Sequence, residues 1–324
     1  MAELETMGDE AGKESEEIER LALSMPSGIL SCSEFPPCGG ASLDLENIEE
    51  LKRKHYQLLP PLQGQLRREL FWILPNGVRL FMRVEEDRRP TAEDDLLTIF
   101  TKKYPASWHM AFAASYEFLV SQAENMSKIE RRLLTPRPET LFRSLELCPL
   151  PKVKVVIMGS GPSADFSGFN PIATGVPFES RAGVPLDKPL QSIFAEIRRD
   201  MSVRGETCVR TTSGDLTRWL EQGVLLLDAP MTAVRGSPEE HKDRWDGLIT
   251  NIIRTICRFH RSGIVFILLG PIAQQFKDKT IGKHLIMITS RPTAYTGRDL
   301  FQGSGVFGKA NDFLVSKAKT PIAW

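Results

Sequence analysis

The chain has 324 residues, of which 41% are hydrophobic and 25% charged, a composition that excludes a wholly disordered protein. At about 150 residues per domain, this length fits one large domain with an appendage or two modest domains. No apolar run reaches the roughly 18 residues of a membrane span, and the five cysteines lack a Cys-x-x-Cys pair, so we expect neither a membrane segment nor a metal site. The acidic N-terminus lacks a signal-peptide pattern and indicates an intracellular protein.

Basic and acidic residues balance at 41 each, but they are unevenly distributed. Residues 1–20 hold eight acidic and two basic side chains, whereas residues 251–324 hold eleven basic and three acidic ones. Such asymmetry is typical of a protein that binds a polyanion and carries an acidic tail, although a lopsided solvated surface gives the same counts.

The first third of the chain divides into a tail and a small extension. Residues 1–43 are rich in Glu, Ser, Gly and Pro without a periodic pattern, which predicts a disordered acidic tail. Residues 44–95 form the extension, with a charged helix over 44–58, a β-hairpin over 68–84 and a charged linker over 85–95. The hairpin turn is assigned to Pro75-Asn76-Gly77, because Asn-Gly is the strongest short hairpin signal.

Residues 96–324 carry the pattern of an α/β domain. A helix is predicted over Ala106–Ala123, with Trp108, Phe112, Tyr116 and Leu119 on one face, and a second over Leu141–Leu147. Four apolar strands then alternate with helices, which favours a three-layer α/β/α sandwich around a central four-stranded, mostly parallel sheet. The strands are expected at 153–158, 224–227, 264–269 and 286–288, and the helices at 191–199, 215–222, 239–259 and 272–277. The working site of such a sheet lies beyond the carboxyl ends of its strands, here residues 159–162, 228–230, 270–271 and 289–292.

Segments spread over residues 104–324 resemble family 1 uracil-DNA glycosylases, in the family's order. They are Leu134–Ser160, Gly214–Leu227, His241 with Trp245, Val265–Gln274, Lys309 with Asn311, and the C-terminal Pro321–Trp324. Thr174–Ser180 looks most like the poxvirus branch, whose member doubles as part of a polymerase processivity factor. The resemblance implies DNA as a partner, a replication or repair protein as a second partner, and no cofactor.

The motif that carries the family's catalytic aspartate is altered in this chain. Where the family reads Gly-Gln-Asp-Pro-Tyr-His-Gly, this chain reads Gly159-Ser160-Gly161-Pro162-Ser163-Ala164-Asp165. The resemblance thus places Gly161 at the water-activating aspartate and Ser163 at the tyrosine that excludes a 5-methyl group. Arg291 stands at the histidine that hydrogen-bonds the uracil carbonyl, so both catalytic groups are replaced.

Two further positions of the implied base pocket concern recognition. Phe178, at the ring that stacks on a flipped base, is retained, whereas Asp228 replaces the asparagine that reads uracil. An ionised carboxylate offers only acceptors to uracil O4, but a protonated one matches cytosine N4 and N3. The alternative interpretation is that Asp228 caps the helix or turn after its strand.

Asp165 is the candidate substitute for the missing catalytic carboxylate, because it follows Gly161 by four residues in a lengthened loop. The interpretation that we favour is a solvated loop aspartate or a helix cap. Arg291 likewise donates either to a base oxygen or, as arginine at a DNA surface more often does, to a phosphate.

The resemblance also implies a DNA-binding loop and helix on this side of the domain. The residues that it implies are Thr293, Tyr295, Thr296, Arg298 and Lys309. Tyr295 stands where the family places a leucine wedge, and it either stacks on bases or lies at a protein interface.

The loss of a general base and of an oxyanion donor costs roughly 10⁴- to 10⁷-fold in rate. We therefore expect a DNA-binding or scaffolding subunit of a replication or base-excision repair assembly, in the nucleus or at a viral replication site, without standard uracil excision. One alternative is an active glycosylase of altered base preference that uses Asp165. Another is a protein-interaction module that docks a partner through the hairpin at 68–84 and binds no DNA.

Overall fold

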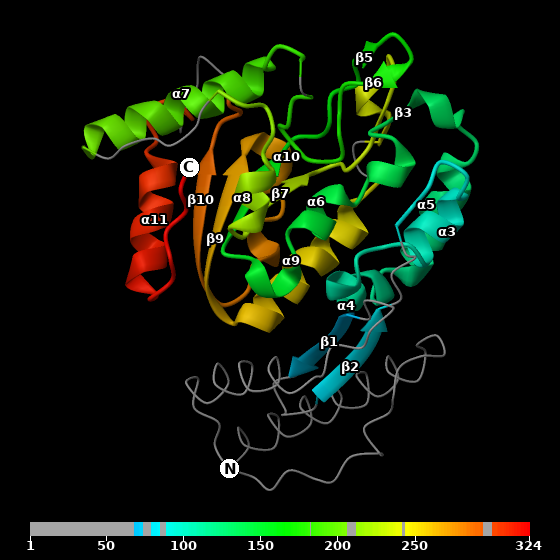
Figure 1. Cartoon of the computed structure of the whole chain (residues 1–324), viewed down its shortest axis with the longest axis horizontal. Helices are drawn as coiled ribbons and strands as arrows, with labels where there is room; N and C mark the ends of the chain where they lie inside the picture. Colours follow the sequence, from blue (N-terminus) through cyan, green and yellow to red (C-terminus); the bar gives the residue numbers. More distant parts are fainter. Residues whose placement is uncertain are drawn as a thin grey trace, which may run out of the picture. The chain divides into compact units, whose positions relative to one another are not determined.

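The computed structural model describes residues 68–73, 79–84, 89–181, 183–205, 212–241, 244–293 and 300–324 (Figure 1). The chain divides into two units, Met1–Asp87 and Arg88–Trp324. The expected tail at 1–43, the helix at 44–58 and the hairpin turn at 75–77 lie outside the described residues.

The described part of the first unit is an antiparallel hairpin. Its strands are β1 (Arg68–Ile73) and β2 (Arg79–Val84), and their register pairs Arg68 with Val84 and Ile73 with Arg79. The two expected strands are therefore confirmed, since aromatic and branched residues on both sides of an Asn-Gly signal favour paired strands.

The second unit is built on a four-stranded sheet in the order β10-β9-β4-β7. The strands are β4 (Val155–Gly159), β7 (Val224–Asp228), β9 (Ser262–Leu269) and β10 (Lys283–Thr289), and every neighbouring pair is parallel. Every residue of β4 and β7 is buried, which explains why these strands read as continuous apolar runs. The expected α/β class is confirmed, and the sheet is parallel throughout.

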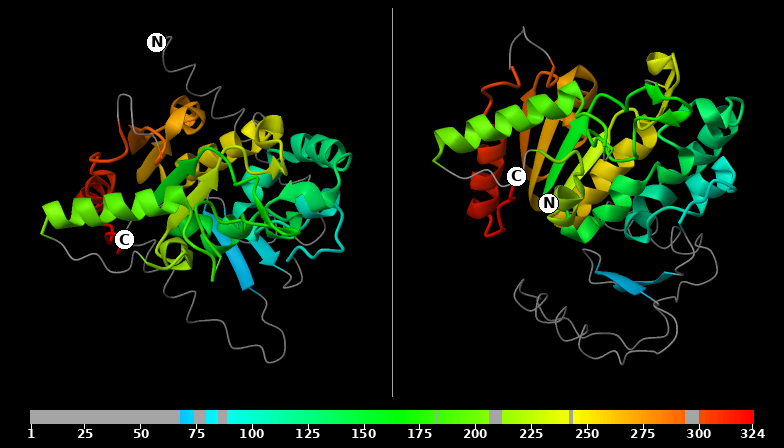
Figure 2. Two further views of the ribbon diagram at one scale, coloured as in Figure 1. Left: turned by 90° about the horizontal axis from the view of Figure 1, so that it is seen from above. Right: turned by 45° about the horizontal axis from the view of Figure 1, so that its top comes forward.

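Helices cover both faces of this sheet. In the right-hand view of Figure 2, α11 (Val306–Ser316) lies on one side of the strands and α9 (Asp246–His260) on the other. Further helices of the unit are α3 (Leu96–Thr101), α4 (His109–Ala113), α5 (Tyr116–Met126), α6 (Arg143–Leu147), α7 (Lys188–Val203), α8 (Thr217–Glu221) and α10 (Gly270–Gln274). Two short antiparallel pairs join β3 (Leu134–Thr135) to β8 (Ala233–Val234) and β5 (Phe166–Ser167) to β6 (Asn170–Pro171). No helix among the described residues is long and apolar enough to cross a bilayer.

The helix expected over 106–123 is broken in two places. A 3-10 turn over Ala106–Trp108 precedes α4, and α4 ends before α5 begins at Tyr116. Trp108, Phe112 and Leu119 are buried as expected, but Tyr116 is 52% exposed, so its assignment to the apolar face was wrong. The break between the two helices changes the register, which sends Tyr116 to the outer surface.

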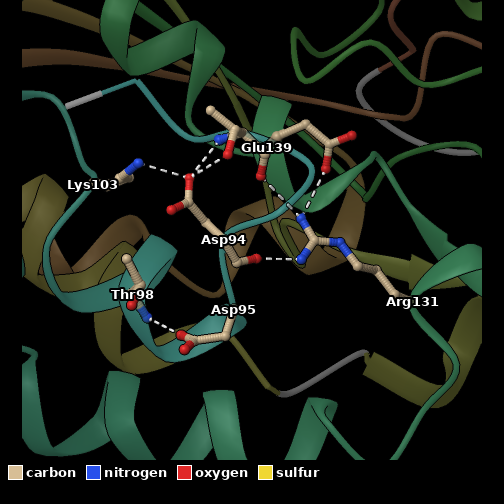
Figure 3. A network of polar contacts seen from close by, with 7 residues as sticks. Asp94, Asp95, Thr98, Lys103, Arg131 and Glu139 are labelled. Carbon is tan, nitrogen blue, oxygen red and sulfur yellow. Dashed lines mark hydrogen bonds and ion pairs between the residues drawn. The ribbon is translucent and has the colours of Figure 1, made fainter. Parts of the chain in front are cut away.

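The C-terminal end of the segment expected to be a linker, around Asp94, is held to the second unit by polar contacts. The Asp94 carboxylate accepts hydrogen bonds from the Thr91 backbone N–H at 2.7 Å and from Lys103 Nζ at 2.8 Å (Figure 3). The Arg131 guanidinium donates to the Asp94 carbonyl and pairs with Glu139. Because these contacts tie the segment to the helices that follow it, the compact unit begins before the expected boundary.

A buried carboxylate of α7 holds the segment that leads into α11, and the two helices contact each other at a steep angle (Figure 1). Glu196 is 0% exposed, and its two oxygens accept the backbone N–H groups of Gly303 at 2.8 Å and Gly305 at 2.9 Å. Arg199 donates two further hydrogen bonds to the same carboxylate. Burial alone would raise the pKa of Glu196, but the hydrogen bonds from Arg199 and the two glycines outweigh burial and hold the pKa below its ordinary value.

Replacing Glu196 by Gln is expected to lower the free energy of unfolding by about 1–3 kcal/mol near neutral pH, because charge-assisted hydrogen bonds to buried partners are lost. A carboxylate with a lowered pKa stabilises the fold at pH values above its ordinary pKa of 4.5. This contribution disappears as the pH falls through the folded-state pKa. Urea denaturation at several pH values measures both effects. The exposed Glu124→Gln is the matched control, and an equal effect of both substitutions would contradict the assignment.

Candidate functional site

A cavity of about 430 Å³ opens at the carboxyl ends of the parallel strands. Its lining includes Gly159–Ser163 at and after the end of β4, Asp228 at the end of β7, Leu269 at the end of β9 and Arg291–Thr293 after β10. All four strands thus contribute to one site, although β9 does so through Leu269 and not through the expected residues 270–271. All five expected pocket residues line the cavity, namely Gly161, Ser163, Phe178, Asp228 and Arg291, and so do the candidate catalytic Asp165 and the expected DNA-binding Thr293.

Gly159 allows a ring and a carboxyl group to meet at the floor of the cavity. A Cβ on this glycine would lie 2.4 Å from Asp228 Oδ1 and 2.8 Å from Phe178 Cζ, so a larger residue here would displace both side chains. Phe178 has a φ of 65°, a left-handed conformation that costs a non-glycine residue about 1–3 kcal/mol. Such strain persists only where the surrounding structure holds it, and it is typical of residues that serve a binding site.

The loop that carries Phe178 is anchored on both sides of the ring. Before it, the Val176 backbone N–H donates to Thr174 Oγ1 at 3.2 Å. After it, the carboxylate of Glu179, which is 8% exposed, pairs with Arg143 and accepts the backbone N–H of Leu216. The two contacts of Glu179 hold the loop against α6, which begins at Arg143, and against the start of α8, which follows Leu216.

Asp228 is a buried ionisable group of the cavity lining, with 7% of its surface exposed. Its Oδ1 accepts the backbone N–H of Gly161 at 3.3 Å, so the carboxyl group braces the loop of the neighbouring strand rather than capping its own turn. Burial raises the pKa of Asp228 to about 7; the Gly161 hydrogen bond lowers it and nearby Asp187 raises it further. Near neutral pH, Asp228 is therefore present in both protonated and ionised forms.

Gly161, where the resemblance places the family's catalytic aspartate, has a backbone that suits glycine. Gly161 has a φ of 119°, and a Cβ here would lie 3.2 Å from Pro230 Cδ. L-residues rarely adopt this conformation. A residue with a side chain at this position would therefore strain the path of the loop.

Asp165 lies at the rim of the cavity and is exposed to solvent. Ser163 Oγ donates to Asp165 Oδ2 at 3.1 Å and accepts the Asp165 backbone N–H at 3.1 Å. The carbonyl of Ser163 in turn accepts Thr135 Oγ1 at 2.9 Å. Because β5 follows Asp165 directly, the idea that this aspartate caps a helix was wrong, and its solvated position agrees with the other half of that interpretation.

Arg291, which follows β10, is exposed to solvent and lines the same cavity. Its Cγ would lie 2.4 Å from a Cβ on Gly270, so the glycine lets the arginine cross over the end of β9. Lys309 lies apart from the cavity lining, on α11, where Nζ donates to the Ser304 carbonyl at 2.7 Å. The expected DNA-binding residues Tyr295, Thr296 and Arg298 lie outside the described residues.

Sequence reasoning missed Asp187 and Lys188, which also line the cavity. Asp187 is the N-cap of α7 and accepts the Leu190 backbone N–H at 2.9 Å, and burial raises its pKa. Aspartate ahead of Lys188-Pro189 is a helix-start signal, but nothing local indicates that this helix begins beside Asp228. The described residues contain no group of three or more His, Cys, Asp or Glu side chains arranged to hold a metal ion.

Residues 145–314 match the family model of the uracil DNA glycosylase superfamily. The chain belongs to this superfamily. It is 34% identical over 225 residues to a uracil-DNA glycosylase of Phocaeicola vulgatus, an alignment that covers 67% of this chain and 97% of the relative. A uracil-DNA glycosylase of Borrelia duttonii is 33% identical over 208 residues, covering 64% of this chain and 89% of the relative.

The fold of this superfamily member agrees with a solved structure. The crystal structure of mimivirus uracil-DNA glycosylase matches with a TM-score of 0.59 at 22% identity, covering 74% of this chain and 90% of that one. The resemblance of residues 104–324 to uracil-DNA glycosylases is thus confirmed at the level of family and fold.

The raised pKa of Asp228 gives a prediction for this superfamily member. A carboxyl group whose folded-state pKa exceeds its unfolded value of 3.8 destabilises the fold increasingly as the pH rises from about 4 to 7. We therefore compare the free energy of unfolding of Asp228→Asn with that of the unsubstituted chain at each pH. The difference is expected to shift in favour of Asp228→Asn by about 2 kcal/mol when the pH rises from 5 to 7.5. Denaturation at both pH values measures the difference. Asp278→Asn, on the surface, is expected to give none; a pH-independent effect at Asp228 would contradict the assignment.

Proposed function

We propose that this chain binds DNA and accommodates a nucleobase in the cavity, without releasing uracil by the family's usual catalytic pair. The observation that carries the proposal is Gly161, which stands where the resemblance places the water-activating aspartate and has a glycine-specific backbone. Phe178 and the cavity beside it support the base-binding half of the proposal.

The size of the catalytic loss favours binding over excision. Cleavage of an N-glycosidic bond develops positive charge on the sugar and negative charge on the base. A positioned general base contributes about 10²- to 10⁴-fold and an oxyanion donor about 10²- to 10³-fold. Gly161 supplies no side chain, and the exposed Arg291 suits a phosphate contact, so neither contribution is provided at its usual position.

A second candidate is an active glycosylase with a different base preference. The observation that favours it is that Asp165 and Asp228 line the same cavity. In this mechanism, the Asp165 carboxylate stabilises the sugar cation and orients a water. Protonated Asp228 accepts a hydrogen bond from cytosine N4 and donates one to N3.

The two candidates differ in a direct assay. We expect no release of uracil from single- or double-stranded oligonucleotides at enzyme concentrations far above those of an active uracil-DNA glycosylase control. The same panel carries thymine, cytosine and damaged bases, and Asp165→Asn is the paired variant. Release of any base that Asp165→Asn abolishes would establish the second candidate and refute the first.

DNA binding itself has a quantitative signature. Phosphate contacts release counterions, so each phosphate neutralised on a single strand lowers the affinity by about 2.6-fold between 50 and 200 mM salt. We expect Arg291→Ala and Lys309→Ala to weaken binding at low salt and to flatten the salt dependence. Absent or salt-insensitive binding, measured by fluorescence anisotropy, would instead favour the protein-interaction module that docks a partner through β1 and β2.

A role as a scaffold follows from the same proposal. A chain that holds DNA without cleaving it suits a subunit of a replication or repair assembly, located in the nucleus or at a viral replication site. The acidic residues 1–20 and the hairpin of the first unit both lie outside the superfamily match, and the proposal assigns a protein partner to them.

A further inference from the structure

Phe169 is the most exposed large apolar side chain among the described residues, with 79% of its surface accessible. It lies in the two-residue turn between β5 and β6, whose register pairs Ser167 with Asn170. An isolated exposed apolar residue is ordinary on a protein surface. Three features of the surrounding hairpin make this one different.

The first feature is the place from which the hairpin rises. Asp165, before β5, and Ile172, after β6, both line the cavity, and the Ile172 backbone N–H donates to the Asp165 carbonyl at 3.0 Å. The hairpin is thus an extension of the cavity rim. Figure 1 shows β5 and β6 at the upper edge of the second unit, beyond β3.

The second feature is that the hairpin is braced. The Arg235 guanidinium lies over the Phe166 ring, 4.8 Å from its centroid. On the other segment, Arg137 Nη2 donates to the Phe169 carbonyl at 2.7 Å. Both contacts come from the loops flanking the β3–β8 pair, so the turn that carries Phe169 is positioned by neighbouring structure as well as by its own two strands.

The third feature is charge. Arg137 and Arg235 place two guanidinium groups beside the hairpin, and Asp165 at its base is the opposing charge. An exposed aromatic ring on a hairpin that two arginines contact suits a strand whose phosphates are anionic and whose bases have flat faces. Base–aromatic stacking with basic side chains along the backbone is the usual mode of single-strand binding.

We infer that Phe169 stacks on a base of a single DNA strand, a few nucleotides at most from the one that occupies the cavity. The inference rests on the proposed function and adds a base contact that the proposed function does not include. Three residues separate the rim from the turn, a reach of roughly 10 Å along a strand. At about 3.4 Å per stacked nucleotide, the contacted base lies within about three positions of the one in the cavity.

The experiment uses the full chain and two fluorescent single-stranded oligonucleotides of equal length. One carries normal bases, and in the other every nucleotide is abasic. Stacking on one base contributes about 1–3 kcal/mol, so Phe169→Ala is expected to weaken binding to the normal strand by about 10-fold. It is expected to leave binding to the abasic strand unchanged. Tyr116→Ala, another exposed aromatic that lies on α5 outside the cavity lining, is the matched control with no expected effect on either strand.

Phe169→Trp provides an independent readout, because its indole adds an exposed emitter to the chain. We expect Phe169→Trp to bind the normal strand as tightly as the unsubstituted chain, with its added fluorescence quenched by that strand and not by the abasic one.

The outcomes separate the two proposals. If the unsubstituted chain binds neither strand, the proposed function fails, and this inference fails with it. If the chain binds but Phe169→Ala binds as tightly, or loses affinity equally for both strands, stacking by Phe169 is refuted and DNA binding stands.

Discussion

The close approach of Phe178 and Asp228 to the backbone of Gly159 is the contact on which the cavity depends. It brings a ring from one loop and a carboxyl group from the end of β7 to the end of β4, in a space that a single Cβ would fill. The parallel sheet makes this meeting possible, because neighbouring strands end at the same edge. The remaining loops are arranged around that floor, with Asp165 at one side of the rim and Arg291 at another strand end.

Under the proposed function, this arrangement separates binding from catalysis. Asp228 is buried and hydrogen-bonded and Phe178 is half-buried and strained, and the proposal assigns base recognition to these two constrained groups. The groups at the positions of the family's chemistry are a glycine with a φ of 119° and an exposed arginine. Buried groups are constrained by their neighbours, whereas the path of an exposed loop changes at little cost to the core. A cavity retained beside altered catalytic positions follows naturally from that difference.

Two further features of the second unit depend on contacts between remote segments. Glu196 ties the segment that precedes α11 to α7, while the β5–β6 hairpin extends the rim of the cavity with Arg137 and Arg235 beside it. Both features bring distant parts of the sequence together through backbone hydrogen bonds to side chains. Such contacts have no periodic pattern in the sequence, and for that reason neither was expected from it.

The sequence by itself determined the parallel sheet, the family and the identity of the altered motif, because continuous apolar runs and ordered motifs are local patterns. Local patterns did not predict two other features. The exposure of Tyr116 depends on a break between helices, and the boundary of the unit depends on contacts of Asp94 with Lys103 and Arg131. Only the tertiary structure decided that Asp187 lines the cavity and that burial raises the pKa of Asp228 to about 7. Burial and distance between remote segments set those properties. Likewise, the zero net charge of the chain is fixed by its composition, whereas the charges that meet at the cavity are fixed by the fold.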